Sequence, residues 1–578
     1  MAKKTLLARY VPITQWAPLY TRAKLADDTV AAVIVSIMLI PQSLGLALVA
    51  GLPPATGLYA SIFGLSVYAL FGTSNTLSVA PVAVISLMTA AALAKLQPAS
   101  PEDIANAALI LALLSGLILS LLGLFRLGFM ANFLSHPVIS AFITASALII
   151  GLSQLKHLLG IQTLGHNFMD LGLSILSGLP DTNYIALTMG LISIGVIYGC
   201  KTKLENLLVR LNMPSYVARV LSRTGPVFVV VGSSLAAYFW QLEVQLLGKI
   251  PSGMPRFQWP SIEKDLFDTL IGSAFLISII GFVESISVAQ TFAANRQEQL
   301  DLDQELVGLG GANIVTSFFN GFPVSGGFSR TVVNFEAGAA TPAAGLITAI
   351  LVAVVALYFT PLLFWLPKVS LAAIILVAVA PLVDFSMLSK SWAYSKADFS
   401  AVFLTLTLTL LVGIEFGIAA GVLASVLLHL YKTSKPHVAV VGRVAGTEHF
   451  RNVKRYDVET FENLLSIRID ESLYFANTRY LEELISKLVA SRPKVEHVIL
   501  MFTAVNAVDL SALDTLSKIN KSLAEVNITL HLSEVKGPIR DRLDRTEFFN
   551  TLSGRCFLSQ NQAVEALKKQ SDAKSMPS

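Results

Sequence analysis

The chain has 578 residues, of which 54% are hydrophobic and only 14% are charged, and its mean hydropathy is +0.66. Soluble domains carry about 25% charged residues, so this composition excludes an ordinary soluble protein. The formal net charge of +4 is not gathered into a block of Lys and Arg interleaved with aromatic residues, which argues against nucleic-acid binding. The two cysteines, Cys200 and Cys556, lie far apart in sequence, and we expect no disulfide framework, zinc site or cofactor.

Apolar runs near the length that crosses a bilayer fill the first three quarters of the chain, between residues 29 and 431. Bounded by Gly, Pro and charged residues, they predict an α-helical membrane protein with both termini in the cytosol. The fourteen predicted spans are residues 29–50, 55–72, 79–95, 105–125, 135–155, 183–200, 217–240, 266–290, 304–320, 328–340, 343–362, 367–382, 398–413 and 414–431.

The distribution of positive charge is an independent test of this topology, because cytosolic segments carry an excess of Lys and Arg. Residues 1–28 lack the short apolar region and cleavage site of a signal peptide, so we expect them to form a cytosolic N-terminal segment. If the N-terminus lies in the cytosol, the segments after the sixth, eighth and twelfth spans lie there as well. The basic residues of these segments are Lys3, Lys4, Arg9, Arg22, Lys24, Lys201, Lys203, Arg210, Arg219, Arg223, Arg296, Lys390 and Lys396.

Two of the spans, 79–95 and 328–340, are too short to cross alone, and each is entered through Pro or Gly. They are the third and the tenth, which are corresponding positions in two halves of seven spans. An odd number of spans inverts the second half relative to the first, and paired broken helices in inverted repeats indicate a transport site at the bilayer midplane. Ordinary kinked helices are the alternative interpretation.

Beyond Tyr431 the sequence changes character, because charges become frequent and apolar residues alternate over short runs. Runs at 464–469 and 497–502 predict strands, and residues 478–491 between them have the apolar spacing of a helix. Residues 432–578 are therefore expected to form a small cytosolic α/β domain with its tail.

Glu284 is the first candidate for chemistry, because an ionisable group at membrane depth is costly and therefore indicates function. Burial disfavours the charged form of a carboxylate, so Glu284 is able to gain and lose a proton as access alternates. The alternative is a carboxylate tied to Ser or backbone donors that fastens helices together.

Arg330 is the second candidate, in the segment Gly326-Gly327-Phe328-Ser329-Arg330-Thr331. A Gly-Gly turn that opens a helix leaves the backbone N–H groups of Phe328 and Ser329, and the Ser329 hydroxyl, free to face an anion. The alternative is that Arg330 pairs with Glu336 or Glu284 and only braces the bundle. The chain has no Gly-Lys-Ser/Thr phosphate loop, which argues against an ATP-driven pump.

Three ordered motifs resemble those of the sulfate-permease (SulP) family of anion transporters. They lie at the first two spans, the eighth span and the tenth span: Pro41-Gln42 with Ala50-Gly51-Leu52-Pro53-Pro54 and Gly57-Leu58-Tyr59; Glu284-Ser285-Ile286-Ser287-Val288-Ala289; and Phe328-Ser329-Arg330-Thr331 with Val333-Asn334-Phe335 and Gly338. The resemblance implies a seven-plus-seven inverted repeat with core and gate domains, a C-terminal STAS domain and a homodimer.

Carried onto this sequence, the resemblance implies an anion site and a coupling group. The implied anion-binding residues are Gln42, Ala83, Val84, Phe328, Ser329 and Arg330, and the implied proton-coupling carboxylate is Glu284. Many members have an aromatic residue where this chain has Leu46, which leaves anion size and selectivity open. In the tail, residues 508–512 resemble the motif that is phosphorylated on serine in anti-sigma-factor antagonists, which are related to STAS domains, so Ser511 is a regulatory candidate. Leu510, however, replaces the usual small polar residue of this motif. The alternative is that Asp509 or Ser511 caps the helix that begins here.

Together these observations predict a multi-pass transporter of the plasma membrane, which is the inner membrane if the source is bacterial, and not an enzyme. Its expected activity is proton-coupled symport of small oxyanions, sulfate first, by an elevator-like motion of the core against the gate. The alternatives are a sodium-coupled bicarbonate or dicarboxylate carrier, an anion channel, and a sensor that signals through the tail to a cytosolic partner.

Overall fold

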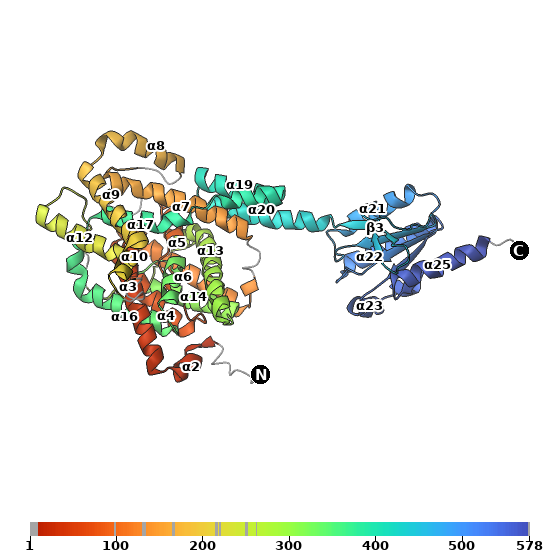
Figure 1. The fold of residues 1–578 in the computed structure, drawn as a ribbon, viewed down its shortest axis with the longest axis horizontal. Coiled ribbons are helices and arrows are strands. Elements are labelled where there is room, and N and C mark those ends of the chain that lie inside the picture. The colour runs from red at the N-terminus through yellow and green to blue at the C-terminus, as the bar shows by residue number, and fades with distance from the viewer. Residues whose placement is uncertain are drawn as a thin grey trace. The chain divides into compact units, whose positions relative to one another are not determined.

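The computed structural model describes residues 10–96, 100–129, 135–163, 168–213, 218, 221–222, 224–248, 253–261 and 263–575. The topology predictions that rest on Lys3, Lys4, Arg9, Arg219 and Arg223 lie outside these residues, as does the start of the seventh predicted span. The chain divides into two compact units, Met1–Ser425 and Val426–Ser578, and the division falls within one helix, α20. Figure 1 colours the helical unit from red to turquoise and the α/β unit blue.

Each of the fourteen predicted spans coincides with a helix. In chain order these are α3 (Arg22–Val49), α4 (Pro54–Phe71), α5 (Ala83–Leu93), α6 (Pro101–Leu124), α7 (His136–Leu159), α9 (Tyr184–Gly199), α12 (Gly225–Trp240), α13 (Lys264–Arg296), α14 (Leu302–Ser317), α15 (Phe328–Glu336), α16 (Ala343–Val354), α17 (Lys368–Val379), α19 (Lys396–Leu411) and α20 (Ile414–Ser434). Among the described residues, nine helical stretches are long and apolar enough to cross a membrane, so a total of fourteen crossings stays a prediction.

Shorter elements connect or extend these helices. They are α2 (Ile13–Trp16), η1 (Ala17–Leu19), α8 (Phe168–Gly178), η3 (Leu179–Asp181), η4 (Cys200–Leu204), α10 (Glu205–Arg210), η5 (Val355–Phe359), η6 (Thr360–Leu363), η7 (Ala380–Leu382) and α18 (Ser386–Tyr394). The elements η4 and η5 are π-helical turns that continue α9 and α16. The sequence pattern does not predict α8, which lies between the fifth and sixth spans.

The two short predicted spans are confirmed as short helices, and each follows a two-residue strand. Strand β1 (Val79–Ala80) precedes α5, and strand β2 (Ser325–Gly326) precedes α15. The strands pair antiparallel, with Val79 opposite Gly326 and Ala80 opposite Ser325. A Cβ at Gly326 would lie 2.6 Å from the Leu77 side chain, so this close approach of the two segments requires glycine.

Buried polar side chains fix this strand pair to the surrounding helices. The Ser285 hydroxyl of α13 accepts a hydrogen bond from the Gly326 N–H at 2.8 Å and donates to the Gly281 carbonyl at 2.6 Å. Asn334 of α15 donates to the Thr76 carbonyl at 2.9 Å, just before β1. The Asn334 bond and the β1–β2 pair join the two halves of the unit, whereas the Ser285 bonds fasten β2 to α13 within the second half.

Glu305 of α14 is a fully buried carboxylate that holds the end of α4 and the loop after it. It accepts hydrogen bonds from the Tyr68 hydroxyl at 2.7 Å, from the Thr73 N–H at 2.7 Å and hydroxyl at 2.6 Å, and from the Ser74 N–H at 3.1 Å. With four donors directed at it, the carboxylate is satisfied in the interior. Glu305 therefore has a structural role, which the sequence did not reveal.

The α/β unit has a sheet of six strands in the order β4-β3-β5-β6-β7-β8. Strands β5 to β8 are parallel, and β3 pairs antiparallel with both β4 and β5. The strands are β3 (Val438–Arg443), β4 (Phe450–Asn452), β5 (Leu464–Ile469), β6 (His497–Met501), β7 (Thr529–Ser533) and β8 (Cys556–Phe557), and the helices are α21 (Thr478–Ala490), α22 (Leu510–Glu525), α23 (Gly537–Leu543), α24 (Phe548–Thr551) and α25 (Gln560–Ser575). The predicted strands and helix between 464 and 502 are confirmed.

Alternation along the strands gives this sheet two apolar faces. Leu465 and Ile467 of β5 face α21 and α22, whereas Leu464 lies on the opposite face together with Val564 of α25. The unit therefore buries a hydrophobic core of its own.

We predict that Glu305→Ala destabilises the helical unit by about 3 kcal/mol, because it leaves four buried donors without an acceptor. The measurement is thermal unfolding of the purified chain in detergent. Glu263→Ala, which removes an exposed carboxylate just before α13, is the matched control. Equal melting temperatures for the two variants would contradict the structural role of Glu305.

Candidate functional site

A cavity with a volume of ≈ 500 Å³ lies between two walls of the helical unit. One wall comes from α3, α5, α13, α15 and the residues just before the two short helices, and the other comes from α9, η4, α10, α12, α17 and η7. All seven candidate residues that the sequence placed in the membrane line this cavity: Gln42, Ala83, Val84, Glu284, Phe328, Ser329 and Arg330.

The N-terminal ends of the two short helices open into this cavity. The first intrahelical bond of α15 runs from the Thr331 N–H to the Gly327 carbonyl at 3.0 Å, and the Ser86 N–H bonds the Val82 carbonyl at 2.9 Å at the start of α5. The N–H groups of residues 328–330 and 83–85 come before these first intrahelical bonds, and they point toward the helix start. Two positive helix ends therefore meet in one cavity, which is an arrangement that suits an anion.

Arg330 is buried, with only 4% of its surface exposed. Its Nη2 donates to the Ala80 carbonyl at 3.3 Å, and its Nε has no hydrogen-bond partner among the described residues. The guanidinium lies so close to Gly327 that a Cβ there would be 2.6 Å from Nη2, so a larger residue at this position would displace the guanidinium. Within the part of the chain that the structure describes, no carboxylate lies within ion-pair distance of Arg330, although the charges of Glu284 and Arg330 attract each other, and bracing by Glu284 or Glu336 stays the alternative to anion binding.

Glu284 contributes a carboxylate to the same cavity from the middle of α13. Its Oε2 atom is buried and has no hydrogen-bond partner among the described residues, whereas the next residue, Ser285, anchors β2. A buried carboxylate oxygen without a partner is costly in its charged form. The Glu284 side chain therefore reaches the cavity, and no hydrogen-bond donor among the described residues is fixed at its Oε2 atom.

The second wall includes a basic residue that the sequence had suggested only as a marker of topology. The π-helical turn η4 carries Lys201, and this residue lines the cavity one turn before Glu205 of α10. Sequence reasoning missed Lys201 because a single extra residue in a helical turn leaves no clear signal in the apolar pattern. Leu46 also lines the cavity, and it supplies an aliphatic surface at the position where many family members have an aromatic ring.

Ser511 lies in the α/β unit, exposed on the first turn of α22. The cap of this helix is Asp509, whose Oδ1 accepts a hydrogen bond from the Ala512 N–H at 2.8 Å. The other carboxylate oxygen of Asp509 accepts from the Phe475 N–H at 2.9 Å. Asp509 thus takes the capping role that the sequence left open between the two residues, and phosphorylation of Ser511 stays a prediction.

Two broken helices that meet at a cavity between two helical walls define a membrane transporter and not an enzyme. The comparisons agree: the model of the sulfate permease family matches residues 25–405, and the model of the STAS domain matches residues 455–563. The chain belongs to the sulfate permease family, and it is a multi-pass membrane protein with a C-terminal STAS domain.

Similar proteins are found among both curated sequences and solved structures. "Sulfate transporter 4.1, chloroplastic" of Arabidopsis thaliana is 35% identical over 522 residues, covering 88% of this chain and 74% of the relative. The solved structure of SLC26A9 matches with a TM-score of 0.88 at 24% identity, covering 98% of this chain and 94% of that one. The transmembrane domain of the cyanobacterial bicarbonate transporter BicA matches with a TM-score of 0.59 at 22% identity, over 70% of this chain and 98% of that one. These structural matches show the fold.

We predict that Ser329→Cys reacts with a small anionic thiol reagent, whereas Ser325→Cys does not, because Ser329 is exposed in the cavity and Ser325 is 1% exposed. Both variants are made in a background without Cys200 and Cys556, and labelling is followed by mass spectrometry. Similar labelling of the two positions would contradict the cavity geometry.

Proposed function

We propose that the chain imports sulfate together with a proton across the plasma membrane, with both termini in the cytosol. The observation that carries this proposal is the convergence of two helix starts, Arg330 and Glu284 on one cavity. The curated relative with 35% identity is named a sulfate transporter, which favours sulfate over other anions. The match to a bicarbonate transporter, at 22% identity, concerns the fold and does not favour bicarbonate.

The anion would be held by many partial charges and one full charge. Free N–H groups of Ala83, Val84, Phe328 and Ser329 are hydrogen-bond donors, and Gln42 adds a side-chain amide at the same cavity. Arg330 supplies the full positive charge, and its contact with Ala80 holds it between the two helix starts. Such a set of donors replaces the water around an anion but binds it less tightly than several cations would, so the anion can still be released.

Glu284 would couple the anion to a proton. In its charged form this carboxylate repels an anion in the same cavity, and in its neutral form it does not. Protonation of Glu284 therefore favours occupation of the cavity by the anion, and loss of the proton on the other side favours release. The reciprocal effect of anion and proton on each other is the thermodynamic basis of symport.

The two walls of the cavity suggest how access alternates. The helix starts, Glu284 and Gln42 all belong to one wall. The opposite wall, formed by α9, η4, α10, α12, α17 and η7, offers mainly apolar side chains together with Lys201, Glu205 and Ser222. Movement of the first wall against the second would carry the complete site, which is an elevator-like motion. The homodimer and a cytosolic partner of the STAS domain stay predictions.

The test is uptake of radiolabelled sulfate into proteoliposomes that contain the full-length chain, with and without an inward proton gradient. We expect accumulation that requires the gradient and that unlabelled sulfate competes better than bicarbonate, succinate or chloride. Stimulation by a sodium gradient would favour a sodium-coupled carrier, and uptake that never exceeds equilibrium would favour a channel. The absence of any uptake by well-folded protein would favour a sensor.

We predict that Glu284→Gln abolishes accumulation driven by the proton gradient but retains sulfate binding, because the amide keeps the size and hydrogen bonding of the side chain and cannot exchange a proton. The measurement pairs gradient-driven uptake with equilibrium binding on the same preparation. Glu263→Gln, at an exposed carboxylate outside the cavity, is the control. Gradient-driven accumulation by Glu284→Gln would rule this residue out as the coupling group.

We predict that Arg330→Ala weakens sulfate binding by tenfold or more, since a charged hydrogen bond contributes about 1.5–3 kcal/mol. Arg330→Lys should be intermediate, because it keeps the charge and loses the planar guanidinium. Arg126→Ala removes an exposed cation that does not line the cavity and serves as the control. Unchanged affinity in a folded, inserted Arg330→Ala protein would assign Arg330 to structure instead of binding.

A further inference from the structure

The α/β unit contains a second cavity, which opens where its sheet separates locally. Strand β3 pairs with β5 only over Val438–Val440 and 467–469, and Arg443 further along β3 pairs again with Glu459. Between these two contacts, residues 460–466 move away from β3. The resulting pocket has a volume of ≈ 460 Å³, which is within the size range of small-molecule sites.

Apolar side chains form most of the walls of this pocket. Val440 and Val441 come from β3, Leu465 from β5, and Val564 from α25, and Phe461 adds an aromatic ring from the separated segment. Val441 and Leu465 are 3% and 1% exposed, so these walls belong to the folded core and are already in place. The pocket is therefore suited to an apolar molecular body.

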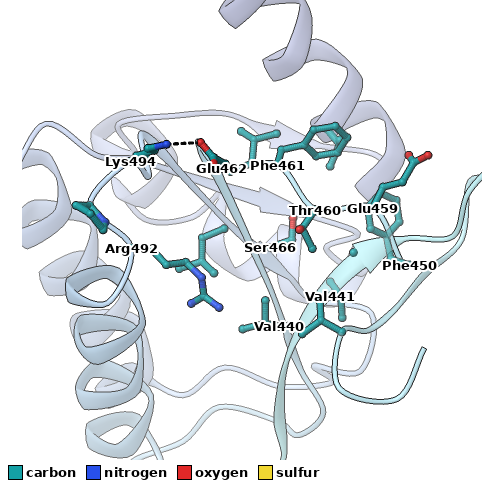
Figure 2. A pocket seen from close by; sticks show the side chains of 16 residues that line it. Val440, Val441, Phe450, Glu459, Thr460, Phe461, Glu462, Ser466, Arg492 and Lys494 are labelled. Carbon is teal, nitrogen blue, oxygen red and sulfur yellow. Dashed lines mark hydrogen bonds and ion pairs between the residues drawn. The ribbon is translucent and has the colours of Figure 1, made fainter. Parts of the chain in front are cut away.

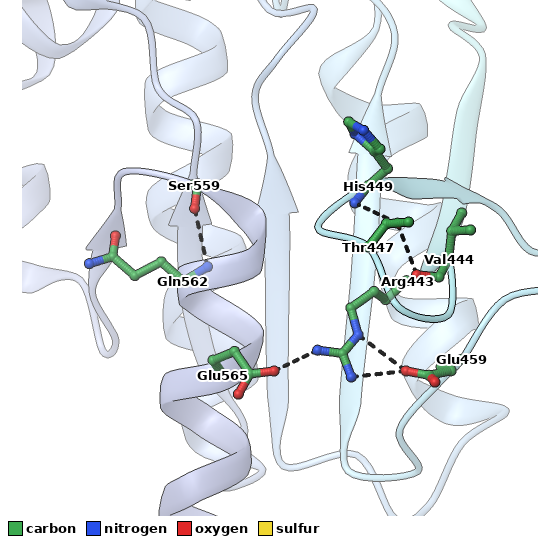
Figure 3. Close-up of polar contacts among 8 residues, drawn as sticks. All are labelled: Arg443, Val444, Thr447, His449, Glu459, Ser559, Gln562 and Glu565. Carbon is green, nitrogen blue, oxygen red and sulfur yellow. Dashed lines mark hydrogen bonds and ion pairs between the residues drawn. The ribbon is translucent and has the colours of Figure 1, made fainter.

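The acidic side chains at the pocket already have basic partners. Glu462 pairs with Lys494 at 2.7 Å, as Figure 2 shows. Glu459 pairs with Arg443 at 2.9 Å, and Arg443 also contacts Glu565 of α25 (Figure 3). These carboxylates and Lys494 consequently leave little free charge for a ligand at this rim.

Arg492 differs from these paired groups. Its side chain points into the pocket (Figure 2), and its Nη1 makes one long hydrogen bond, to the Leu488 carbonyl at 3.4 Å. In the part of the chain that the structure describes, no carboxylate lies within ion-pair distance of this guanidinium. An arginine with an open planar fork is well suited to bind a carboxylate through two parallel hydrogen bonds.

A second polar group in the pocket also has unused hydrogen-bonding capacity. Ser466 of β5 is 7% exposed, and its hydroxyl oxygen accepts a hydrogen bond from Gln560 Nε2 at 2.8 Å. The proton of this hydroxyl has no acceptor among the described residues, so Ser466 is available as a donor. The pocket thus offers one unpaired cation, one buried donor and apolar walls.

We propose that this pocket is a binding site for a small organic carboxylate with an apolar body. Arg492 pairs with the carboxylate, and the body lies in the gap between β3 and β5, against Val441 and Phe461 on one face of the sheet and Leu465 on the other. A monoanion matches the single unpaired cation, since Lys494 is already neutralised by Glu462. An inorganic anion would leave the apolar walls without a partner, and a neutral molecule would leave Arg492 without one.

The first test uses hydrogen–deuterium exchange on the full-length chain in lipid nanodiscs, with 2-naphthoate as the probe. We expect protection of peptides that cover residues 459–466 and 491–495. The neutral 2-naphthamide controls for partition into lipid, and inorganic sulfate controls for charge alone. Equal protection of these peptides by the amide, or by sulfate, would overturn the proposed ligand class, and so would an absence of protection by 2-naphthoate.

The second test changes the cation. Arg492→Gln should weaken 2-naphthoate binding by tenfold or more, and Arg492→Lys should be intermediate because it keeps the charge without the fork. Arg479→Gln is the matched control, since Arg479 lies on α21 of the same unit, is 89% exposed and pairs with Glu483 away from the pocket. Wild-type affinity in both Arg492 variants, with unchanged thermal unfolding, would overturn the proposal.

Discussion

The antiparallel pairing of β1 with β2 is the constraint on which the rest of the helical unit depends. It joins only two residues from each half of the chain, Val79–Ala80 and Ser325–Gly326, yet each strand leads directly into a short helix. Since the strands run in opposite directions, their helices begin on either side of the pair and their positive ends open into one cavity. The hydrogen bonds of Ser285 and Asn334 hold this geometry at the level of the backbone.

Buried charges in the unit divide into two kinds by their hydrogen bonds. Glu305 is surrounded by donors, and Asp28 likewise accepts from the Ala340 N–H at 2.6 Å and from Thr341. Glu284 and Arg330, in contrast, border the cavity with atoms that have no partner among the described residues. A satisfied buried charge stabilises one arrangement of the chain, whereas an unsatisfied one is available to a ligand or a proton. This difference separates structural from functional groups more clearly than burial alone.

Much of this arrangement could be predicted from the sequence, because apolar length and Gly or Pro interruptions are local signals. They located the two short helices, and the few ionisable residues at membrane depth led to Glu284 and Arg330. The role of Glu305 could not be predicted, because its donors are about 230 residues away in the chain. Lys201 was missed as a cavity residue since only the packing of η4 against the site reveals it. The pocket around Arg492 depends on a local separation of two strands, which has no periodic signature.

The central claim, that the two helix starts together form the anion site, is tested most directly by imaging the bound anion. The measurement is a cryo-electron microscopy map of the full-length chain in nanodiscs, with and without sulfate at saturating concentration. We predict a density that appears only with sulfate, between Ala83–Val84 and Phe328–Ser329 and within contact of Arg330. A sulfate density elsewhere in the membrane unit, with this cavity empty, would contradict the claim.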